Sequence, residues 1–222
     1  MAAPPLIRIT LTLCLAIGAL VSVRAADVPI VIAWHAAGAP ADVDEGVRMG
    51  AAEAQQTATL LNRAVRLDPQ AAHPYATIEA SGGAVAIAAG ERCTYRISPE
   101  AADEAARLAA WNARVARTGR YEVMAWHASL KQFGAFELNE RFTRQFHAPM
   151  TQGAWFGWVA VKATTEAALR SDRSACAALA DLQFDGHKGT ALSFRNRILQ
   201  QPLYVIEHTA TGDTVAGQVP PR

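Results

Sequence analysis

The sequence predicts an α/β protein built on a parallel β-sheet, and three consecutive segments support this prediction. Residues 28–34 (VPIVIAW) form a nearly continuous apolar run, typical of a strand buried in a parallel sheet. Residues 44–63 follow as a helix, and residues 64–68 (AVRLD) form a short second strand. Strand, helix and strand in about forty residues make a βαβ unit, which places parallel strands in one sheet with helices on its faces.

The rest of the chain continues the alternation of strands and helices. After a loop at 69–83, we expect strands at 84–88, 94–97, 121–126, 191–194, 203–208 and 214–218, and helices at 98–117, 133–146 and 151–170. The first of these helices is predicted to begin with Ser98 as its N-cap and Pro99 in its first turn. Thr118 and Gly119 end that helix, and Pro149 separates the last two.

Composition excludes several classes of protein. Of the 222 residues, 51% are hydrophobic and 18% are charged, which allows a sizeable core and argues against disorder. A net charge of +1 leaves no basic stripe to neutralise phosphates, so nucleic acid is not an expected partner. The chain also lacks a GxSxG elbow, a P-loop and a GxGxxG after the first strand. We therefore do not expect an enzyme.

The first 25 residues are typical of a secretory signal peptide. Arg8 precedes an apolar run at 9–23, and small residues precede the expected cleavage site after Ala25. The alternative is an uncleaved membrane anchor, although the run is short for a spanning helix. The sequence thus predicts an exported mature chain of residues 26–222.

Two cysteines, Cys93 and Cys176, remain after this cleavage. An oxidising compartment permits a disulfide between them, and two separate buried thiols are equally compatible with the sequence. Neither cysteine lies in a CxxC motif or near a histidine at ligand spacing, so zinc and redox chemistry are not supported.

The tetrapeptide Ala-Trp-His-Ala occurs at 33–36 and again at 125–128, each time at the end of a predicted strand. Ligands of open α/β sheets bind outside the carboxyl ends of strands, so His35 and His127 are candidate ligand-binding residues, with Trp34 and Trp126 as an aromatic wall. The repeat is also compatible with coincidence in an alanine-rich chain. Either histidine would then cap its strand through a backbone hydrogen bond.

A metal site is a second possibility near the first strand. His35 with Asp42, Asp44 and Glu45 offers one imidazole and three carboxylates, which suit a hard or borderline cation. The spacing matches no EF-hand or HExxH motif. The alternative is a solvated acidic start of the helix, where carboxylates favour the positive end of the helix dipole.

Several segments together resemble a known family. They are WHASL at 126–130, FG at 133–134, LNERF at 138–142, WFGWVAVKATTEAA at 155–168, FDGHKG at 184–189, LSFR at 192–195 and QPL at 201–203. They resemble the C-terminal part of type I periplasmic solute-binding proteins, in the branch found with PQQ-dependent alcohol dehydrogenase systems and their ABC transporters. Residues 46–68 and the stretch from Cys93 to Pro99 resemble that branch more loosely.

The resemblance implies a bilobed periplasmic protein that binds a small solute between its lobes and delivers it to an ABC permease. The implied cargo is the quinone cofactor PQQ, a lanthanide or calcium ion, or an alcohol-derived metabolite, and a PQQ-dependent dehydrogenase is a possible partner. The first lobe would cover about 26–117 and a reduced second lobe, with return segments, about 118–222. The units that build the second lobe of ordinary members are missing between 117 and 121, which implies a truncated lobe. The alternative is a non-transport accessory protein that kept the scaffold and binds a protein partner.

Overall fold

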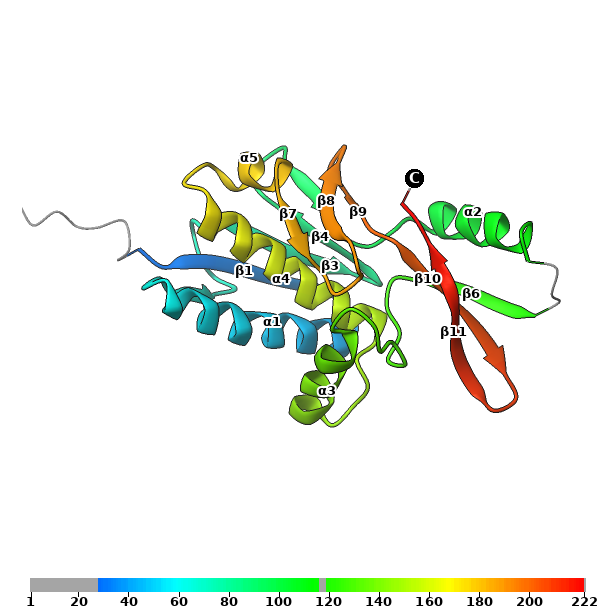
Figure 1. Ribbon diagram of the computed structural model, residues 1–222. Coiled ribbons are helices and arrows are strands. Elements are labelled where there is room, and N and C mark those ends of the chain that lie inside the picture. Colours follow the sequence, from blue (N-terminus) through cyan, green and yellow to red (C-terminus); the bar gives the residue numbers. More distant parts are fainter. Residues whose placement is uncertain (1–27, 116–118, 222) are drawn as a thin grey trace, which may run out of the picture.

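An eight-stranded sheet and a separate three-stranded sheet organise the chain (Figure 1). The computed structural model describes residues 28–115 and 119–221, so the predicted signal peptide at 1–25 lies outside the described residues. The helices are α1 (Ala41–Leu60), α2 (Ala101–Asn112), α3 (Ala135–Phe146), α4 (Gln152–Arg170) and α5 (Ala175–Ala180). The strands are β1 (Ile30–Ala37), β2 (Val65–Leu67), β3 (Ala76–Ser81), β4 (Ala84–Ala88), β5 (Thr94–Arg96), β6 (Arg120–Met124), β7 (Gln183–Asp185), β8 (Ala191–Arg195), β9 (Ile198–Gln200), β10 (Leu203–Thr209) and β11 (Gly212–Val219).

The predicted α/β class and the first βαβ unit are confirmed. The large sheet has the order β2-β1-β3-β4-β5-β9-β8-β7, and β1 pairs in parallel with both β2 and β3. The sheet is mixed beyond this point, because β4 pairs antiparallel with β3 and β5, and β8 pairs antiparallel with β7 and β9. The turn between β3 and β4 contains Gly82 at φ 56°, a left-handed conformation that glycine adopts without strain.

One face of the large sheet carries the main core. α1 and α4 lie side by side against this face and bury the inward residues of the strands, such as Ile32, Ile78 and Ile87 (Figure 1). The two helices approach closely because glycines lie at their contact. A Cβ atom added at Gly46 of α1 would lie 1.9 Å from the carbonyl oxygen of Ala154 in α4. The bare backbone at this position therefore sets the distance between the helices.

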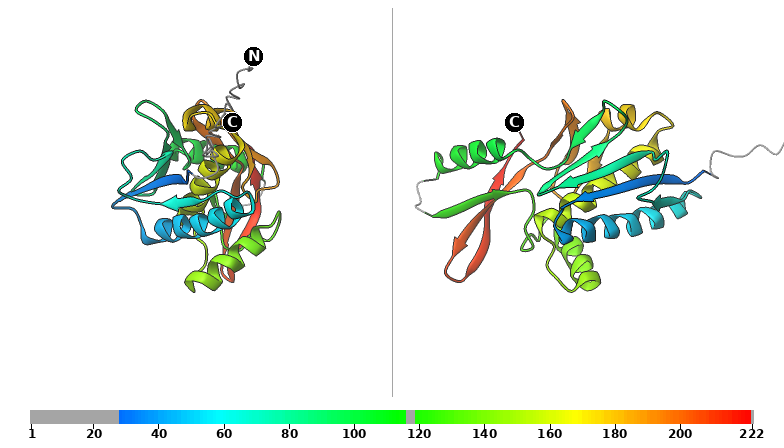
Figure 2. Two further views of the ribbon diagram at one scale, coloured as in Figure 1. Left: turned by 90° about the vertical axis from the view of Figure 1, so that its left-hand side faces the viewer. Right: turned by 180° about the vertical axis from the view of Figure 1, so that it is seen from behind.

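The opposite face of the large sheet is open. Seen from behind in Figure 2, strands β1, β3 and β4 lie in front, and none of the described helices covers them. The side chains of this face are small or charged, and most are partly or fully exposed. They include Ala33, His35, Thr77, Glu79, Ser81, Ala84, Ala86, Ala88, Thr94 and Arg96.

The three-stranded sheet has the order β11-β10-β6 and is antiparallel throughout. α2 packs on it, with the Trp111 ring 6.4 Å from the ring of Tyr121 in an edge-on arrangement. We call this sheet together with α2 the small part, and the large sheet with α1, α3, α4 and α5 the body. The chain passes between them at 97–100, 125–134 and 201–202. These three segments are the connections.

Several predicted boundaries need correction. The expected loop at 69–83 contains strand β3, and β7, β9 and α5 are additional elements. The predicted helix at 98–117 begins at Ala101 and ends at Asn112, while residues 116–118 lie outside the described part of the chain. Ser98 is not the N-cap, because its hydroxyl accepts a hydrogen bond from the backbone N–H of Val85. Within the described residues, no helix combines the length and apolar character that crossing a membrane requires.

Candidate functional site

A hollow lies on the open face of the large sheet, toward the carboxyl ends of β1 and β3. It has a volume of about 750 Å³, within the range of small-molecule pockets. Its floor is made by small residues such as Ala84 and Ala86 of β4. The hairpin turn between β8 and β9, with Asn196 and Arg197 in left-handed conformations, borders it on one side. We call this hollow the groove.

One row of residues across the sheet supplies two of the charged side chains of the groove, and Glu100 and Arg197 supply two more. His35 on β1 lies directly opposite Glu79 on β3, Glu79 lies opposite Ala86 on β4, and Ala86 lies opposite Arg96 on β5. Adjacent strands are about 4.8 Å apart, so the backbones of Glu79 and Arg96 are about 10 Å apart with only a methyl group between them. The row thus places a carboxylate and a guanidinium on either side of a shallow depression.

The charged side chains of the groove are only partly engaged by partners within the protein. Arg96 is paired with Glu100, and Arg197 donates from Nη1 to the carbonyl oxygen of Arg92 (2.6 Å). Among the described residues, the carboxylate of Glu79 has no hydrogen bond or ion pair within the groove or elsewhere. The groove can therefore contact both an anionic group and a cationic or hydrogen-bond-donating group of a ligand.

Of the predicted ligand-binding residues, His35 lines the groove and Trp34 does not. His35 belongs to β1 itself and not to a loop after it, and its Nε2 lies 3.2 Å from the carbonyl oxygen of Pro69. This is the backbone hydrogen bond that the sequence left open as an alternative. Trp34 points to the helical face, where its Nε1 donates to Asp44 Oδ1 (2.9 Å).

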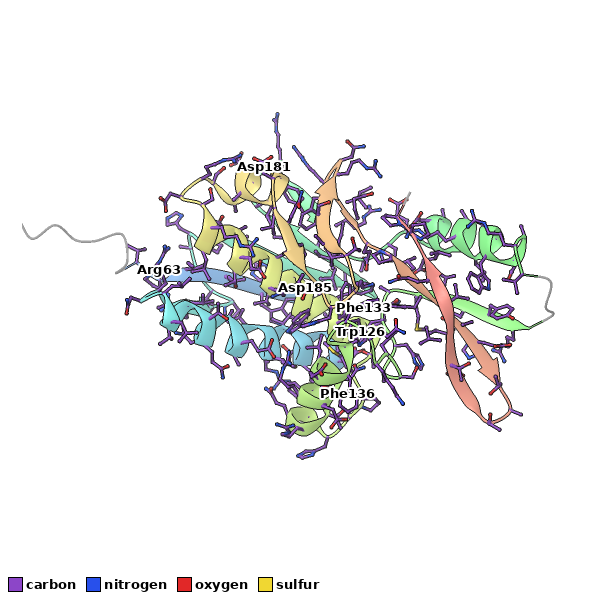
Figure 3. The ribbon with its side chains drawn as sticks, in the orientation of Figure 1. Arg63, Trp126, Phe133, Phe136, Asp181 and Asp185 are labelled. Atoms are coloured by element: carbon purple, nitrogen blue, oxygen red, sulfur yellow. A yellow bond between two sulfur atoms is a disulfide. The ribbon has the colours of Figure 1, made fainter. Side chains whose placement is uncertain are left out.

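Trp126 and His127 lie far from this row, in the connection after β6. Trp126 is fully buried near the start of α4, where its ring stacks on Trp155 at 5.7 Å (Figure 3). Its Nε1 donates to Asn139 Oδ1 (2.9 Å), so its side chain belongs to the core and not to an open surface. His127 Nδ1 lies 2.7 Å from Ser129 Oγ. The structure therefore does not bring the two Ala-Trp-His-Ala segments together, and a shared ligand role remains a prediction.

The metal hypothesis for His35, Asp42, Asp44 and Glu45 needs correction. No three His, Cys, Asp or Glu side chains lie together as a metal-ligand group in the described ranges. The carboxylates serve the start of α1 instead. Asp42 accepts from the backbone N–H of Val43 and from the Thr151 hydroxyl, and Asp44 pairs with Arg48 (2.8 Å). The acidic helix start is thus the alternative that the structure supports.

Cys93 and Cys176 form a disulfide in the structure, with their Cα atoms 5.9 Å apart. It joins the chain just before β5 to α5 and lies beside Tyr95, whose hydroxyl donates to the carbonyl oxygen of Cys176 (2.6 Å). The bridge therefore holds α5 against the edge of the groove that β5 forms.

Sequence reasoning missed Glu79, Arg96 and Arg197. Glu79 falls in the segment that was expected to be a loop, and the alternation in ATIEAS was its only signal. Arg96 and Arg197 come together because β5 pairs with β9, a contact between segments far apart in the sequence. No local pattern carries that information.

Comparisons with known proteins give partial structural similarities. No protein-family model matches the chain, and no curated protein matches it. An ABC transporter substrate-binding protein from Sphaerobacter thermophilus is 16% identical, with a TM-score of 0.40 over 52% of this chain and 34% of that chain. A branched chain amino acid ABC transporter periplasmic ligand-binding protein from Burkholderia xenovorans is 15% identical, with a TM-score of 0.41 over 47% and 31%.

A third similar structure is an ABC transporter solute binding protein from R. palustris in complex with benzoate. It is 18% identical, with a TM-score of 0.39 over 50% of this chain and 32% of that chain. The matched part spans about a third of the length of these proteins and about half of this chain. The chain is thus similar to one portion of such proteins.

Proposed function

We propose that the protein is a periplasmic solute-binding protein of an ABC importer, and that it binds a small polar solute in the groove. The observation that supports this proposal is the row that places Glu79 and Arg96 on either side of Ala86 in a hollow of about 750 Å³. A solute with an acidic group and a donor group would satisfy both side chains at once. The groove also lies toward the carboxyl ends of β1 and β3, where ligands of α/β sheets bind.

The finer part of the proposal is a link with PQQ-dependent alcohol oxidation, which rests on the sequence resemblance. PQQ is a compact, flat carboxylate-bearing molecule. The guanidinium groups of Arg96 and Arg197 border the groove and suit such a ligand, because arginine binds planar carboxylates through paired hydrogen bonds. A reduced small part agrees with the truncated second lobe that the resemblance implies.

Calorimetric titration of the purified protein tests the proposal. The panel is PQQ, calcium and a lanthanide ion, and branched-chain amino acids. We expect one member to bind. If it is PQQ or an amino acid, Arg197→Met and Glu79→Gln should each weaken binding at least tenfold, whereas binding of a metal ion should be weakened by Glu79→Gln alone. Arg66→Met is the matched control, because Arg66 lies on β2 of the same sheet, is exposed and does not line the groove.

Two results would contradict the proposal. One is a folded protein that binds no member of the panel. The other is binding that Arg66→Met weakens as much as Arg197→Met does, because the site would then lie outside the groove.

A second candidate is an accessory protein that binds a protein partner, and the open face of the large sheet favours it. This face presents small and charged side chains that none of the described helices covers, so it is accessible to a partner. A photo-crosslinking residue at Ala88 of β4 would capture the PQQ-dependent dehydrogenase or the permease, whereas the same residue at Thr57 on α1 would not. Equal capture from both positions, or capture from neither, would contradict this function.

A further inference from the structure

Lys188 is a buried cation in the turn between β7 and β8. Its side chain is 1% exposed, yet its Nζ atom makes three hydrogen bonds. It donates to the carbonyl oxygen of Ala125 (2.5 Å), to Gln201 Oε1 (2.9 Å) and to the carbonyl oxygen of Pro202 (3.0 Å). The three acceptors match the three donors of an ammonium group.

No carboxylate forms an ion pair with Lys188 in the described residues. Its Nζ atom instead lies 4.2 Å from the ring centre of Trp155 and 5.2 Å from that of Tyr204, in cation–π contact. Burial lowers the pKa of Lys188 well below its usual value, and the positive charge of Arg107 lowers it further. Burying this group is therefore costly, and its hydrogen bonds and aromatic contacts offset part of that cost.

The acceptors of Lys188 lie on the connections between the body and the small part. Ala125 begins the connection after β6, and Gln201 with Pro202 forms the connection from β9 to β10. The third connection, from β5 to α2, is reached through Gln201, whose Nε2 donates to the carbonyl oxygen of Ile97 (3.0 Å). Lys188 and Gln201 thus tie all three connections to one point.

Arg107 joins the same point from α2 in the small part. Its Nη1 donates to the carbonyl oxygens of Gln201 (2.9 Å) and Pro220 (3.1 Å), and its Nη2 pairs with Asp103 (2.7 Å). The end of β11 is held as well, because Gln218 Nε2 donates to the carbonyl oxygen of Lys188 (3.2 Å). The bond from Arg107 to Gln201 is buried and the bond from Gln218 to Lys188 is partly buried, while Gln201 and Lys188 are each 1% exposed.

We propose that Lys188, Gln201 and Arg107 form a lock that fixes the small part relative to the body, so that the protein binds its ligand without closure of one part over the other. Any rotation at the connections has to separate Lys188 from its acceptors and leave a buried cation unpaired. The first half of this proposal concerns the fold alone. The second half, binding without closure, rests on the proposed function of the groove.

Hydrogen exchange of the unliganded protein, followed by mass spectrometry, tests the lock. The variants are Lys188→Met and Gln201→Leu. Lys162→Met is the control, because Lys162 is a partly exposed lysine of α4 that pairs with Glu166 and contacts none of the connections. We expect exchange at 97–100, 125–130 and 201–206 to rise at least tenfold in Lys188→Met, while exchange in β1 and β3 stays unchanged.

The comparison with β1 and β3 separates a lock from a general contribution to stability. Exchange that rises equally in β3 and at the connections would overturn the proposal, as would an unchanged pattern in both variants. If Lys188→Met does not fold, Gln201→Leu decides, since it keeps the buried cation with two of its acceptors and removes the bond to Ile97. Selective exchange at the connections supports the lock in either variant.

A second measurement tests binding without closure, with PQQ as the probe. Small-angle scattering of the wild-type protein is expected to give the same radius of gyration with and without saturating PQQ. A smaller radius with PQQ bound would overturn binding without closure. If PQQ fails to bind, that result counts against the proposed function, and the exchange experiment alone decides the lock.

Discussion

Replacing Lys188 by methionine is expected to lower the free energy of unfolding by about 3–5 kcal/mol. Methionine keeps the length and the apolar stem of the side chain but removes the three donors. The carbonyl oxygens of Ala125 and Pro202 and the amide oxygen of Gln201 then lose a buried partner, at roughly 1–3 kcal/mol each. The three losses together come to roughly 3–9 kcal/mol. The variant no longer has to bury an ammonium group, and this gain offsets part of the loss, so we expect a value in the lower half of that range.

Urea unfolding, followed by tryptophan fluorescence, measures this difference. The midpoint should fall while the slope with denaturant stays the same, because the surface exposed on unfolding is unchanged. Lys162→Met is the control, and it should lose less than Lys188→Met, because Lys162 is partly exposed and its ammonium group can be solvated by water. A Lys188→Met protein as stable as the wild type would refute the reasoning, because desolvation would then outweigh the hydrogen bonds.

The same comparison has an expected dependence on pH. Because the pKa of Lys188 is lowered in the folded protein, the unfolded chain binds more protons at pH values between the folded pKa and the ordinary pKa of 10.5. Stability contributed by this group therefore rises with pH across that window and falls to its minimum below the folded pKa. The deficit of Lys188→Met relative to wild type should be larger at pH 9.5 than at pH 7. A deficit that shrinks with rising pH would contradict the direction of the shift.

Two further predictions concern the packing of the body. The double variant Cys93→Ala with Cys176→Ala should lose about 4.5 kcal/mol of unfolding free energy, measured in urea. The reason is that the bridge closes a loop with a sequence separation of 83 in the unfolded chain. A loss below about 1 kcal/mol would show that the bridge does not constrain the unfolded chain. Gly46→Ala should lose at least about 3 kcal/mol, since its Cβ would lie 1.9 Å from the backbone oxygen of Ala154. Gly83→Ala is the control, because no atom lies within 4 Å of the added carbon, and it should change stability by less than about 0.5 kcal/mol. Equal effects of Gly46→Ala and Gly83→Ala would contradict the close contact between α1 and α4.

Local patterns predicted the elements that bury a continuous apolar surface. β1, α1 and β2 were expected at 28–34, 44–63 and 64–68, and α4 was expected at 151–170, where the structure has Thr151 as its N-cap. β3 was missed because its six residues include Thr77, Glu79 and Ser81 on the open face, so only half of the strand is apolar. Because none of the described helices covers that face, the strand lacks the usual sequence signal of a buried strand.

The candidate site was less predictable than the fold. The sequence identified His35, which lines the groove, but the charges opposite it come from strands whose pairing is set by long-range contacts. Lys188 gave no signal either. In the sequence it is one lysine in a turn-like segment, FDGHKG, and its burial depends on Trp155 and Tyr204 from distant elements. Side chains that join several parts of a fold are defined by tertiary structure alone.

The three-stranded sheet is built from strands far apart in the sequence, and this constrains the order in which the protein can fold. β6 ends at Met124, but its neighbour β10 begins at Leu203 and has β11 on its other side. During synthesis, β6 therefore remains without its pairing partner until almost the whole described chain has been made. Such late, non-local pairing slows folding and leaves a strand edge unpaired and open to aggregation in the meantime. Shortening the chain before β10 would make that exposure permanent, so the body cannot be produced free of the small part merely by deleting the last two strands.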